Sequence, residues 1–313
     1  MIEEKYVTAV VFAFNEEKHI QETLDSIESQ KEVDKIIFID DQSTDMTVDI
    51  VLNYEGKIEI EIYKNENKGK ANAFALGLSK VNTELFFVCH GDDILLSGYV
   101  EKLYSYIKEK SIEFCHANSI ECDINMTPIR DSVVKETYLD IEILNRNSIG
   151  GYIFGYSKII KNILPLPKGL TFEDWFTNIK LVCFYNKLYV YVPPTFLYRR
   201  HLGSDSIKLN KTLSGRSFEL LRRILDENLI LLNEVQRIKL NKTKERYYEI
   251  SLAMDYLFLK NNKVTSPNIL LKYKNLSFYL KFLIRIKKIF NLDQQQMLKL
   301  DDYLIQKIKS VKR

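Results

Sequence analysis

The sequence predicts an α/β protein: a mostly parallel sheet with helices on both faces, followed by a helical C-terminal appendage. Three observations predict this fold class. Over 7–117, short β-branched and aromatic segments alternate with segments whose apolar residues recur at helical spacing. After about residue 212, only helical patterns occur and lysine is frequent. The 313 residues, 46% hydrophobic and 28% charged, suffice for one large globular domain with an appendage.

Strands and helices are expected to alternate, as in successive βαβ units with right-handed crossovers. The helix at 17–29, for example, places Ile20 and Leu24 on one apolar face. In chain order we expect strands at 7–14, 35–39, 58–63 and 85–90 with helices at 17–29, 48–52, 69–80 and 97–110, then strands at 112–117 and 152–156, a helix at 171–184 and a strand at 187–192.

This topology should bring distant loops together. Crossovers of one sense make parallel strands end at the same edge of the sheet. The loops after Phe14, Ile39 and Cys89 are therefore expected to share one edge. In open sheets of this kind, a ligand binds at that edge.

The change of pattern divides the chain into an α/β domain over 1–210 and a helical region over 211–313. The helical region contains basic, amphipathic stretches at 281–290 and 307–313. These could lie on an anionic membrane surface, pack on the body with a solvated lysine face, or form a contact in a homo-oligomer. The sequence leaves all three open.

Composition excludes several classes of protein. A net charge of +3 is too small for a typical nucleic-acid-binding protein. The four cysteines form no CxxC pair, so they predict reduced thiols rather than a disulfide framework or a zinc site. The N-terminus lacks the basic start of a signal peptide, and no stretch approaches the roughly 20 apolar residues of a membrane span. We therefore expect a cytoplasmic protein, with peripheral contact at the inner face of the cell membrane left open.

One motif, His90-Gly91-Asp92-Asp93, directly follows the apolar segment 85–89. Two carboxylates at the open end of a buried strand repel each other, and a divalent cation such as Mg²⁺ or Mn²⁺ would relieve that repulsion. Gly-Asp-Asp is also favourable turn chemistry, and alone it favours a turn. The neighbouring motifs favour a site.

Four motifs in order along the predicted edge resemble those of the family 2 glycosyltransferases of the GT-A fold. They are VVFAFNEE at 10–17, DDQSTD at 40–45, NKGKA at 67–71 and HGDD at 90–93; the resemblance continues at 173–174 and 198–201. It implies inverting transfer of a sugar from a nucleotide-diphosphate donor, usually a UDP-sugar. We expect the acceptor to be a hydroxyl of a glycan or lipid-linked molecule, as in bacterial surface polysaccharide synthesis.

The resemblance implies a nucleotide pocket at the end of the first strand. Asp41 would accept a hydrogen bond from an N–H of the base, although it could instead satisfy backbone amides of its loop. We prefer the nucleotide role for Asp41 and assign helix capping to Asp45. Lys70, at a predicted helix start, would bind the diphosphate or lie solvated beside a loop. The implied donor-binding residues are Ala13, Phe14, Asn15, Glu16, Asp41, Lys70, Gly91 and Asp92.

The resemblance also implies a divalent metal, Mn²⁺ or Mg²⁺, at the donor diphosphate. Asp92 matches the family's metal-coordinating aspartate, and Asp93 would support the metal or cap the turn. His90 stands where the family usually has the first aspartate of its DXD signature. It could bind the metal, with a preference for manganese, contact the ribose, or be structural.

The segment after the last predicted strand matches the family as well. His201 resembles a late histidine that completes the metal or diphosphate site. Arg199 and Arg200 would then lie near phosphate oxygens, or on a solvated basic loop.

Asp174 corresponds to the family's catalytic base, which takes the proton of the acceptor hydroxyl as that oxygen attacks. Thr171 and Asp174 also have the spacing of a capping box at a helix start, and both roles can hold. Glu173 is the fallback base, and Trp175 could stack on an acceptor sugar or belong to the core.

The sequence thus predicts an inverting, metal-dependent glycosyltransferase. One alternative is a nucleotidyltransferase, disfavoured because no glycine-rich phosphate loop follows the first strand. The other is a non-catalytic nucleotide-sugar-binding module of the same fold, which the histidine at position 90 keeps open.

Overall fold

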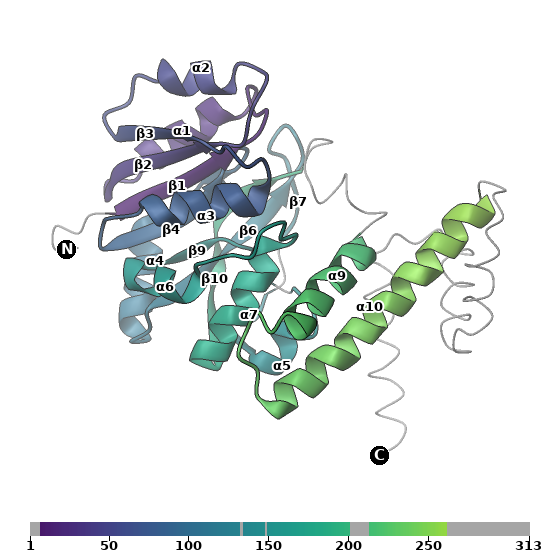
Figure 1. The fold of residues 1–313 in the computed structure, drawn as a ribbon. Helices are drawn as coiled ribbons and strands as arrows, with labels where there is room; N and C mark the ends of the chain where they lie inside the picture. The colour runs from purple at the N-terminus through teal and green to yellow at the C-terminus, as the bar shows by residue number, and fades with distance from the viewer. Residues whose placement is uncertain (1–6, 132–133, 148, 201–212, 262–313) are drawn as a thin grey trace. The chain divides into compact units, whose positions relative to one another are not determined.

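The computed structural model describes residues 7–131, 134–147, 149–200 and 213–261 (Figure 1). The chain divides into two compact units. The first holds the described residues up to 200 together with Asn228–Lys239, and the second holds the described residues of 202–227 and 240–313. The segment Asn228–Lys239 thus groups with the α/β part, although the sequence assigned it to the helical region. Gln236 contributes to this grouping, because its Nε2 donates to Asp140 Oδ2 at 3.1 Å.

The first unit is built on one large mixed sheet with the strand order β3-β2-β1-β4-β9-β6-β10-β5. β1 pairs in parallel with β2 and β4, β2 with β3, and β6 with β10, whereas β9 and β5 run antiparallel to their neighbours. The strands are β1 (Val7–Ala13), β2 (Val33–Asp40), β3 (Glu59–Lys64), β4 (Leu85–His90), β5 (Ile94–Leu95), β6 (Phe114–Cys122), β9 (Ile153–Tyr156) and β10 (Lys187–Arg199), with β7 (Pro128–Asp131) on β6 and β8 (Thr137–Leu139) on β10.

Helices cover both faces of this sheet, which confirms the predicted fold class. Alternate residues of β1 explain the arrangement: Val11 faces the core cluster formed with α1 and α4, whereas Phe12 packs its ring against Phe74 of α3. The helices of the first unit are α1 (Ile20–Glu28), α2 (Thr47–Leu52), α3 (Lys70–Lys80), α4 (Tyr99–Glu109), α5 (Asp140–Ile143), a 3₁₀ turn (Ser157–Ile159), α6 (Ile160–Ile163) and α7 (Glu173–Tyr185).

Helix α3 lies unusually close to the sheet at Gly77. A Cβ atom at this position would lie 2.5 Å from Val10 Cγ1 and 3.2 Å from Ile39 Cγ1. Only glycine permits this approach of helix and strand. Figure 1 shows α3 lying across the β1–β4 part of the sheet.

Two local predictions need correction. The capping box at Thr171 does not form, because α7 begins at Glu173 and Phe172, with φ +61°, is the residue that precedes it. The strand expected at 187–192 continues to Arg199, with shifts in its pairing to β6 on either side of Pro194. Pro193 and Pro194 cannot donate to the ladder, so the regular pairing with β6 is interrupted there before it resumes at Phe196.

The C-terminal part contains α9 (Leu213–Asp226) and α10 (Glu234–Asn261). Within the second unit, the rings of Phe218 and Tyr248 pack with their centroids 5.1 Å apart. The basic stretches at 281–290 and 307–313 lie outside the described residues. In the part of the chain that the structure describes, none of the helices has the length and apolar character to cross a membrane.

Candidate functional site

The two aspartates after β4 have different environments. Asp93 is fully buried; its Oδ1 accepts the backbone N–H of Arg199 at 2.9 Å, and its Oδ2 accepts the hydroxyl of Tyr152. Burial, and next the neighbouring Asp92, raises the pKa of Asp93 well above its usual range. Asp92 is half-buried. Asp93 therefore belongs to the protein's own framework, and Asp92 is the member that a ligand can reach.

His90 is enclosed by two aromatic rings. The centroid of its imidazole lies 4.6 Å from that of Phe12 and 4.9 Å from that of Tyr152, both in edge-on geometry. Burial, followed by the positive charge of Lys70, lowers the pKa of His90 to about 3, with Asp92 opposing. The imidazole is therefore neutral near pH 7 and retains a nitrogen lone pair that a cation could use.

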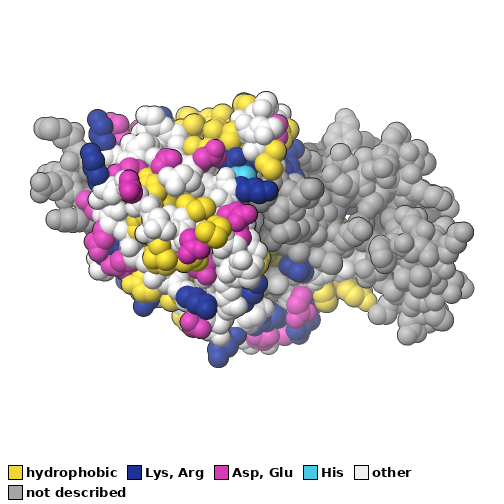
Figure 2. Space-filling view, turned by 90° about the horizontal axis from the view of Figure 1, so that it is seen from above, with side chains coloured by type: hydrophobic (Ala, Val, Ile, Leu, Met, Phe, Trp, Pro, Cys, Tyr) yellow, Lys and Arg dark blue, Asp and Glu magenta, His cyan; other side chains and the backbone are white. Residues whose placement is uncertain are grey.

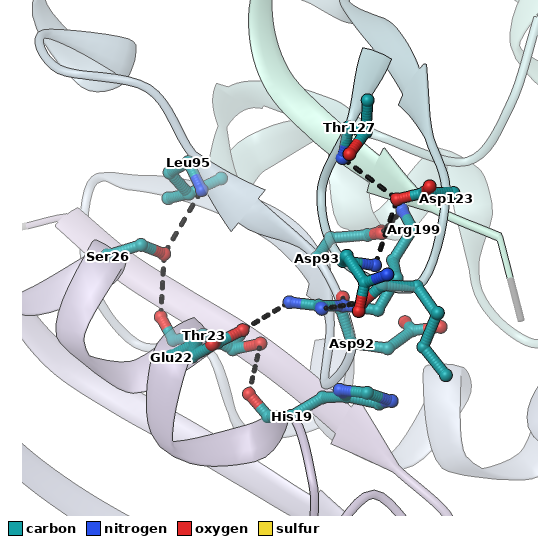
Figure 3. A network of polar contacts seen from close by, with 12 residues as sticks. His19, Glu22, Thr23, Ser26, Asp92, Asp93, Leu95, Asp123, Thr127 and Arg199 are labelled. Atoms are coloured by element: carbon teal, nitrogen blue, oxygen red, sulfur yellow. Dashed lines mark hydrogen bonds and ion pairs between the residues drawn. The ribbon is translucent and has the colours of Figure 1, made fainter. Parts of the chain in front are cut away.

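Arg199 holds the backbone around these aspartates (Figure 3). Its side chain is 3% exposed. Nε donates to the carbonyl oxygen of Asp92 at 2.9 Å, Nη1 donates to that of Ile124 at 2.8 Å, and Nη2 pairs with the Glu22 carboxylate of α1. Neither sequence interpretation, a phosphate contact or a solvated loop, fits this guanidinium. It is a buried clamp that joins α1, the turn after β4 and the loop after β6.

The loops after β1 and β2 are joined, as the predicted shared edge requires. Asn15 Oδ1 accepts the backbone N–H of Thr44 at 2.8 Å, and the N–H of Asn15 donates to Ser43 Oγ at 3.0 Å. Asp45 accepts from the N–H of Thr47 at 3.0 Å through Oδ1 and from the N–H of Glu17 at 3.1 Å through Oδ2. Asp45 thus accepts the first N–H of α2 and also fixes the loop after β1, but the N-cap position is Met46, one residue after the predicted cap.

Ala13 and Gly91 lie next to each other at this edge, at the ends of β1 and β4. A Cβ at Gly91 would lie 2.7 Å from the Cβ of Ala13, so the two loops meet in close contact there. Phe14 follows with its ring 37% exposed, and Lys68 Nζ lies 3.9 Å from the ring centroid. Glu16 is anchored by its backbone N–H, which donates to Thr47 Oγ1 at 2.7 Å.

Asp41 is buried at the end of β2 and organises the neighbouring loop. Its Oδ1 accepts from Asn65 Nδ2 at 2.6 Å and from the N–H of Gly69 at 2.8 Å, directly before α3. This is the loop role that the sequence left as an alternative. The contact of Asp41 with a base stays a prediction.

Lys70 begins α3 and forms an ion pair with Glu173, at 3.4 Å between Nζ and Oε1. The side chain of Lys70 is 39% exposed and that of Glu173 is 8% exposed. Burial raises the pKa of Glu173, and Lys70 opposes that shift. The same ammonium lowers the pKa of His90 and opposes the rise at Asp93. Lys70 therefore lies between the end of β4 and the start of α7.

Asp174, at the start of α7, is half-buried and held at both oxygens. Oδ2 accepts from Asn147 Nδ2 at 2.7 Å, and Oδ1 accepts the backbone N–H of Trp175 at 2.8 Å. Gly151 lies against it, since a Cβ there would be 3.2 Å from the Cβ of Asp174. The next residue is Tyr152, whose hydroxyl donates to Asp93. Two consecutive residues thus contact an acidic residue at each place, Gly151 that at the start of α7 and Tyr152 that in the turn after β4.

Trp175 is a core residue. It is 2% exposed, and its ring N–H donates to the carbonyl oxygen of Ile143 at 2.7 Å. This arrangement favours the core alternative and leaves no open ring face for an acceptor sugar. Glu173, the fallback base, is engaged by Lys70. Arg200 pairs with Glu121 at 2.8 Å.

A divalent cation would find two suitable donors here, the Asp92 carboxylate and the neutral His90 imidazole, a set that suits manganese. Both Asp93 oxygens already have protein partners. Over the described residues, no three His, Cys, Asp or Glu side chains form a group that could hold a metal ion. His201 lies outside that part of the chain. The remaining ligands would come from a diphosphate and water, as is usual for metals bound with nucleotides.

Sequence reasoning did not single out Tyr152, Asn147 or Asn178. Each is a single polar residue without a motif, and Asn147 lies where the strand and helix patterns become irregular. Only their positions in the fold connect them with the acidic residues.

Acidic and basic side chains are interspersed on the face of the molecule that Figure 2 shows. Over its coloured, described surface neither sign forms one continuous field. This agrees with the small net charge of +3.

Comparison with known proteins agrees with this fold. The family model for glycosyl transferase family 2 matches residues 8–202. Glycosyltransferase GlyG of Streptococcus pneumoniae is 26% identical over 219 residues, which cover 63% of this chain and 72% of that protein. An uncharacterized glycosyltransferase of Haemophilus influenzae is 26% identical over 328 positions, covering 91% of this chain and 98% of its own length.

A poly(ribitol-phosphate) beta-glucosyltransferase of Bacillus spizizenii is 28% identical over 180 residues. The match covers 56% of this chain but only 27% of that longer protein. Among solved structures, residues 1–349 of S. aureus TarS in complex with UDP-GlcNAc align with a TM-score of 0.58 at 19% identity, covering 81% of this chain and 73% of that one. This likeness shows a shared fold. Since the family model spans well over half of the chain, the protein belongs to glycosyl transferase family 2.

Proposed function

We propose that this protein is an inverting, metal-dependent glycosyltransferase. In this proposal it moves a sugar from a nucleotide-diphospho-sugar, a UDP-sugar, to a hydroxyl of a glycan or lipid-linked acceptor in bacterial surface polysaccharide synthesis. The single observation that carries it is the position of Lys70, which pairs with Glu173 next to Asp174 and whose charge also acts on His90 at the end of β4. Relatives named as poly(ribitol-phosphate) transferases and a neighbour holding UDP-GlcNAc support the choice of donor and acceptor.

Donor binding is assigned to residues of the α/β domain, 1–210. The exposed Phe14 ring and the loop after β1 would receive the nucleotide. The ammonium of Lys70, at the positive N-terminal end of α3, would contact the diphosphate. To do so it would leave or share its contact with Glu173.

Asp92 and His90 would hold the divalent cation on the diphosphate. When bound, it supplies stabilisation of the negative charge that develops on the departing nucleotide.

Asp174 is the proposed general base. Both its oxygens are hydrogen-bonded, yet each retains a lone pair that could accept a proton or hydrogen bond from the acceptor hydroxyl. Asp174 would take this proton as the acceptor oxygen attacks the anomeric carbon. Because the attack comes from the side opposite the leaving nucleotide diphosphate, the configuration of that carbon would be inverted.

The test incubates the full chain with Mn²⁺ and UDP-glucose or UDP-N-acetylglucosamine and measures released UDP, first with water and then with a ribitol-phosphate polymer as acceptor. We expect UDP release that stops when the metal is chelated. The configuration of the product, read by NMR, tests inversion. Nucleotide-sugar binding without turnover would favour the non-catalytic module, and pyrophosphate released from a nucleoside triphosphate would favour a nucleotidyltransferase.

A further inference from the structure

Two asparagines stand behind the Asp174 carboxylate. Asn147 donates to Asp174 Oδ2 at 2.7 Å. Asn178 lies one helical turn after Asp174 on α7, is fully buried, and donates through Nδ2 to Ile149 O at 3.1 Å and to Asn147 Oδ1 at 3.4 Å. No motif drew attention to either residue.

The orientation of both amides follows from the backbone. The carbonyl oxygen of Ile149, and that of Gly150 at 3.4 Å, can only accept hydrogen bonds, so Asn178 must turn its NH₂ group toward them. Asn147 meets this NH₂ group with its own carbonyl oxygen. Its NH₂ group is then left to face Asp174. In the part of the chain that is described, the buried Oδ1 of Asn178 has no hydrogen-bond partner, so this orientation is kept although it leaves one acceptor unsatisfied.

We propose that Asn147, with its amide direction set by Asn178, is the positioning residue of the catalytic base Asp174. This inference rests on the proposed transferase function. Donors at both carboxylate oxygens, Asn147 on Oδ2 and the Trp175 N–H on Oδ1, fix the plane of the carboxylate. The remaining lone pairs then point in defined directions toward an acceptor hydroxyl. Asn178 also bonds the backbone next to Gly151, the residue that packs against Asp174.

The main test compares Asn147→Ala, the isosteric Asn147→Asp and the control Asn145→Ala from the same segment. Each is assayed with UDP-N-acetylglucosamine and Mn²⁺ for UDP release. We expect kcat to fall about tenfold to a hundredfold in both Asn147 variants, because a misdirected base loses alignment with the attacking oxygen. KM for the donor and the melting temperature should stay near those of the unmodified chain. Full activity in Asn147→Asp would overturn the proposal, because an aspartate fills the same space but cannot donate.

Asn178→Ala tests the second step. Its effect on kcat should not add to that of Asn147→Ala in the double variant, since both act through the same hydrogen bond. Losses that multiply in the double variant would overturn the role of Asn178 as the residue that directs Asn147.

A third measurement does not depend on turnover. The side-chain amide signal of Asn147, assigned in an NMR spectrum of asparagine-labelled protein by its loss in Asn147→Ala, should shift in Asp174→Asn and in Asn178→Ala. A signal that ignores both changes would overturn the inference. An unmodified chain that binds the donor yet releases no UDP would count against the proposed function alone, and the NMR result would still decide the orientation.

Discussion

Asp92-Asp93 and Glu173-Asp174 are two pairs of adjacent carboxylates on different elements of the first unit. In each pair one member is buried and bound by the protein: Asp93 by Tyr152 and the Arg199 backbone, Glu173 by Lys70. The other member is half-buried. The order differs, because the half-buried residue comes first after β4 and second at the start of α7. Adjacent acidic residues in this protein thus have different environments, one buried and one half-buried, and the proposed ligand roles belong to the half-buried member of each pair.

The largest effect should separate the members of the α7 pair. Asp174→Asn should lower turnover by about 10²- to 10⁴-fold, because the proposed base can no longer take a proton. UDP binding, measured by calorimetry, should change little. Glu173→Gln is the matched control, and we expect it to keep most of the turnover. Equal losses of turnover in Asp174→Asn and Glu173→Gln would contradict the assignment of Asp174, rather than Glu173, as the base.

A second comparison uses the adjacent arginines that flank the end of β10. Arg199→Met should cost about 3 kcal/mol in the free energy of unfolding, since the carbonyl oxygens of Asp92 and Ile124 lose their donors at about 1–3 kcal/mol each. Arg200→Met loses only a partly exposed ion pair and should cost about 1 kcal/mol or less. Urea unfolding measures the free energy of unfolding of both variants. A larger loss in Arg200→Met than in Arg199→Met would contradict the structural role assigned to Arg199.

Alanine at each position of the β4 pair should give opposite results. Asp93→Ala leaves the Tyr152 hydroxyl and the Arg199 N–H without their acceptor, at a cost of about 1–3 kcal/mol in stability. Asp92→Ala should keep the melting temperature and weaken Mn²⁺-dependent UDP binding about tenfold, which is about 1.4 kcal/mol. Thermal unfolding and calorimetry on the same samples check this. Unchanged UDP binding in Asp92→Ala would remove the metal role from that residue.

The smallest effect concerns pH. Burial raises the pKa of Glu173 above its ordinary 4.5, so the folded state holds this proton more tightly than the unfolded state. The stabilisation from this group is present below pH 4.5 and is lost as pH rises through the folded-state pKa. Glu173→Gln should therefore gain stability relative to the unmodified chain as pH rises above 4.5, by at most about 1.4 kcal/mol per pH unit. Unfolding free energies that stay parallel over pH 4–8 would contradict this.

Much of the frame could be predicted because strands and helices in βαβ units carry strong periodic patterns. The segments at 7–14, 85–90 and 69–80 became β1, β4 and α3 within a residue or two. The shared edge of the sheet followed from topology alone, before any side chain was placed. The position of Asp45 at the start of α2 followed from the sequence to within one residue, since the N-cap position is Met46.

What could not be predicted depends on long-range contacts. Nothing in the local sequence indicates that Arg199 would reach Glu22, 177 residues earlier in the chain. Trp175 stands beside the proposed base in the sequence, yet its side chain turns into the core. The predicted capping box at Thr171 does not form, because Phe172, whose φ is positive, takes the N-cap position and α7 begins one residue later than the spacing suggested.

The close packing of α3 against the sheet at Gly77 affects the position of the Lys70 ammonium. Lys70 lies seven residues earlier on the same rigid helix, about 10 Å along its axis. Any side chain at Gly77 would meet Val10 and lift α3 from the sheet. Because the helix is rigid, its first residue would move with it, and the ammonium of Lys70 would lie farther from Glu173. The absence of a side chain at Gly77 thus helps to hold the positive charge of Lys70 near His90 and Glu173.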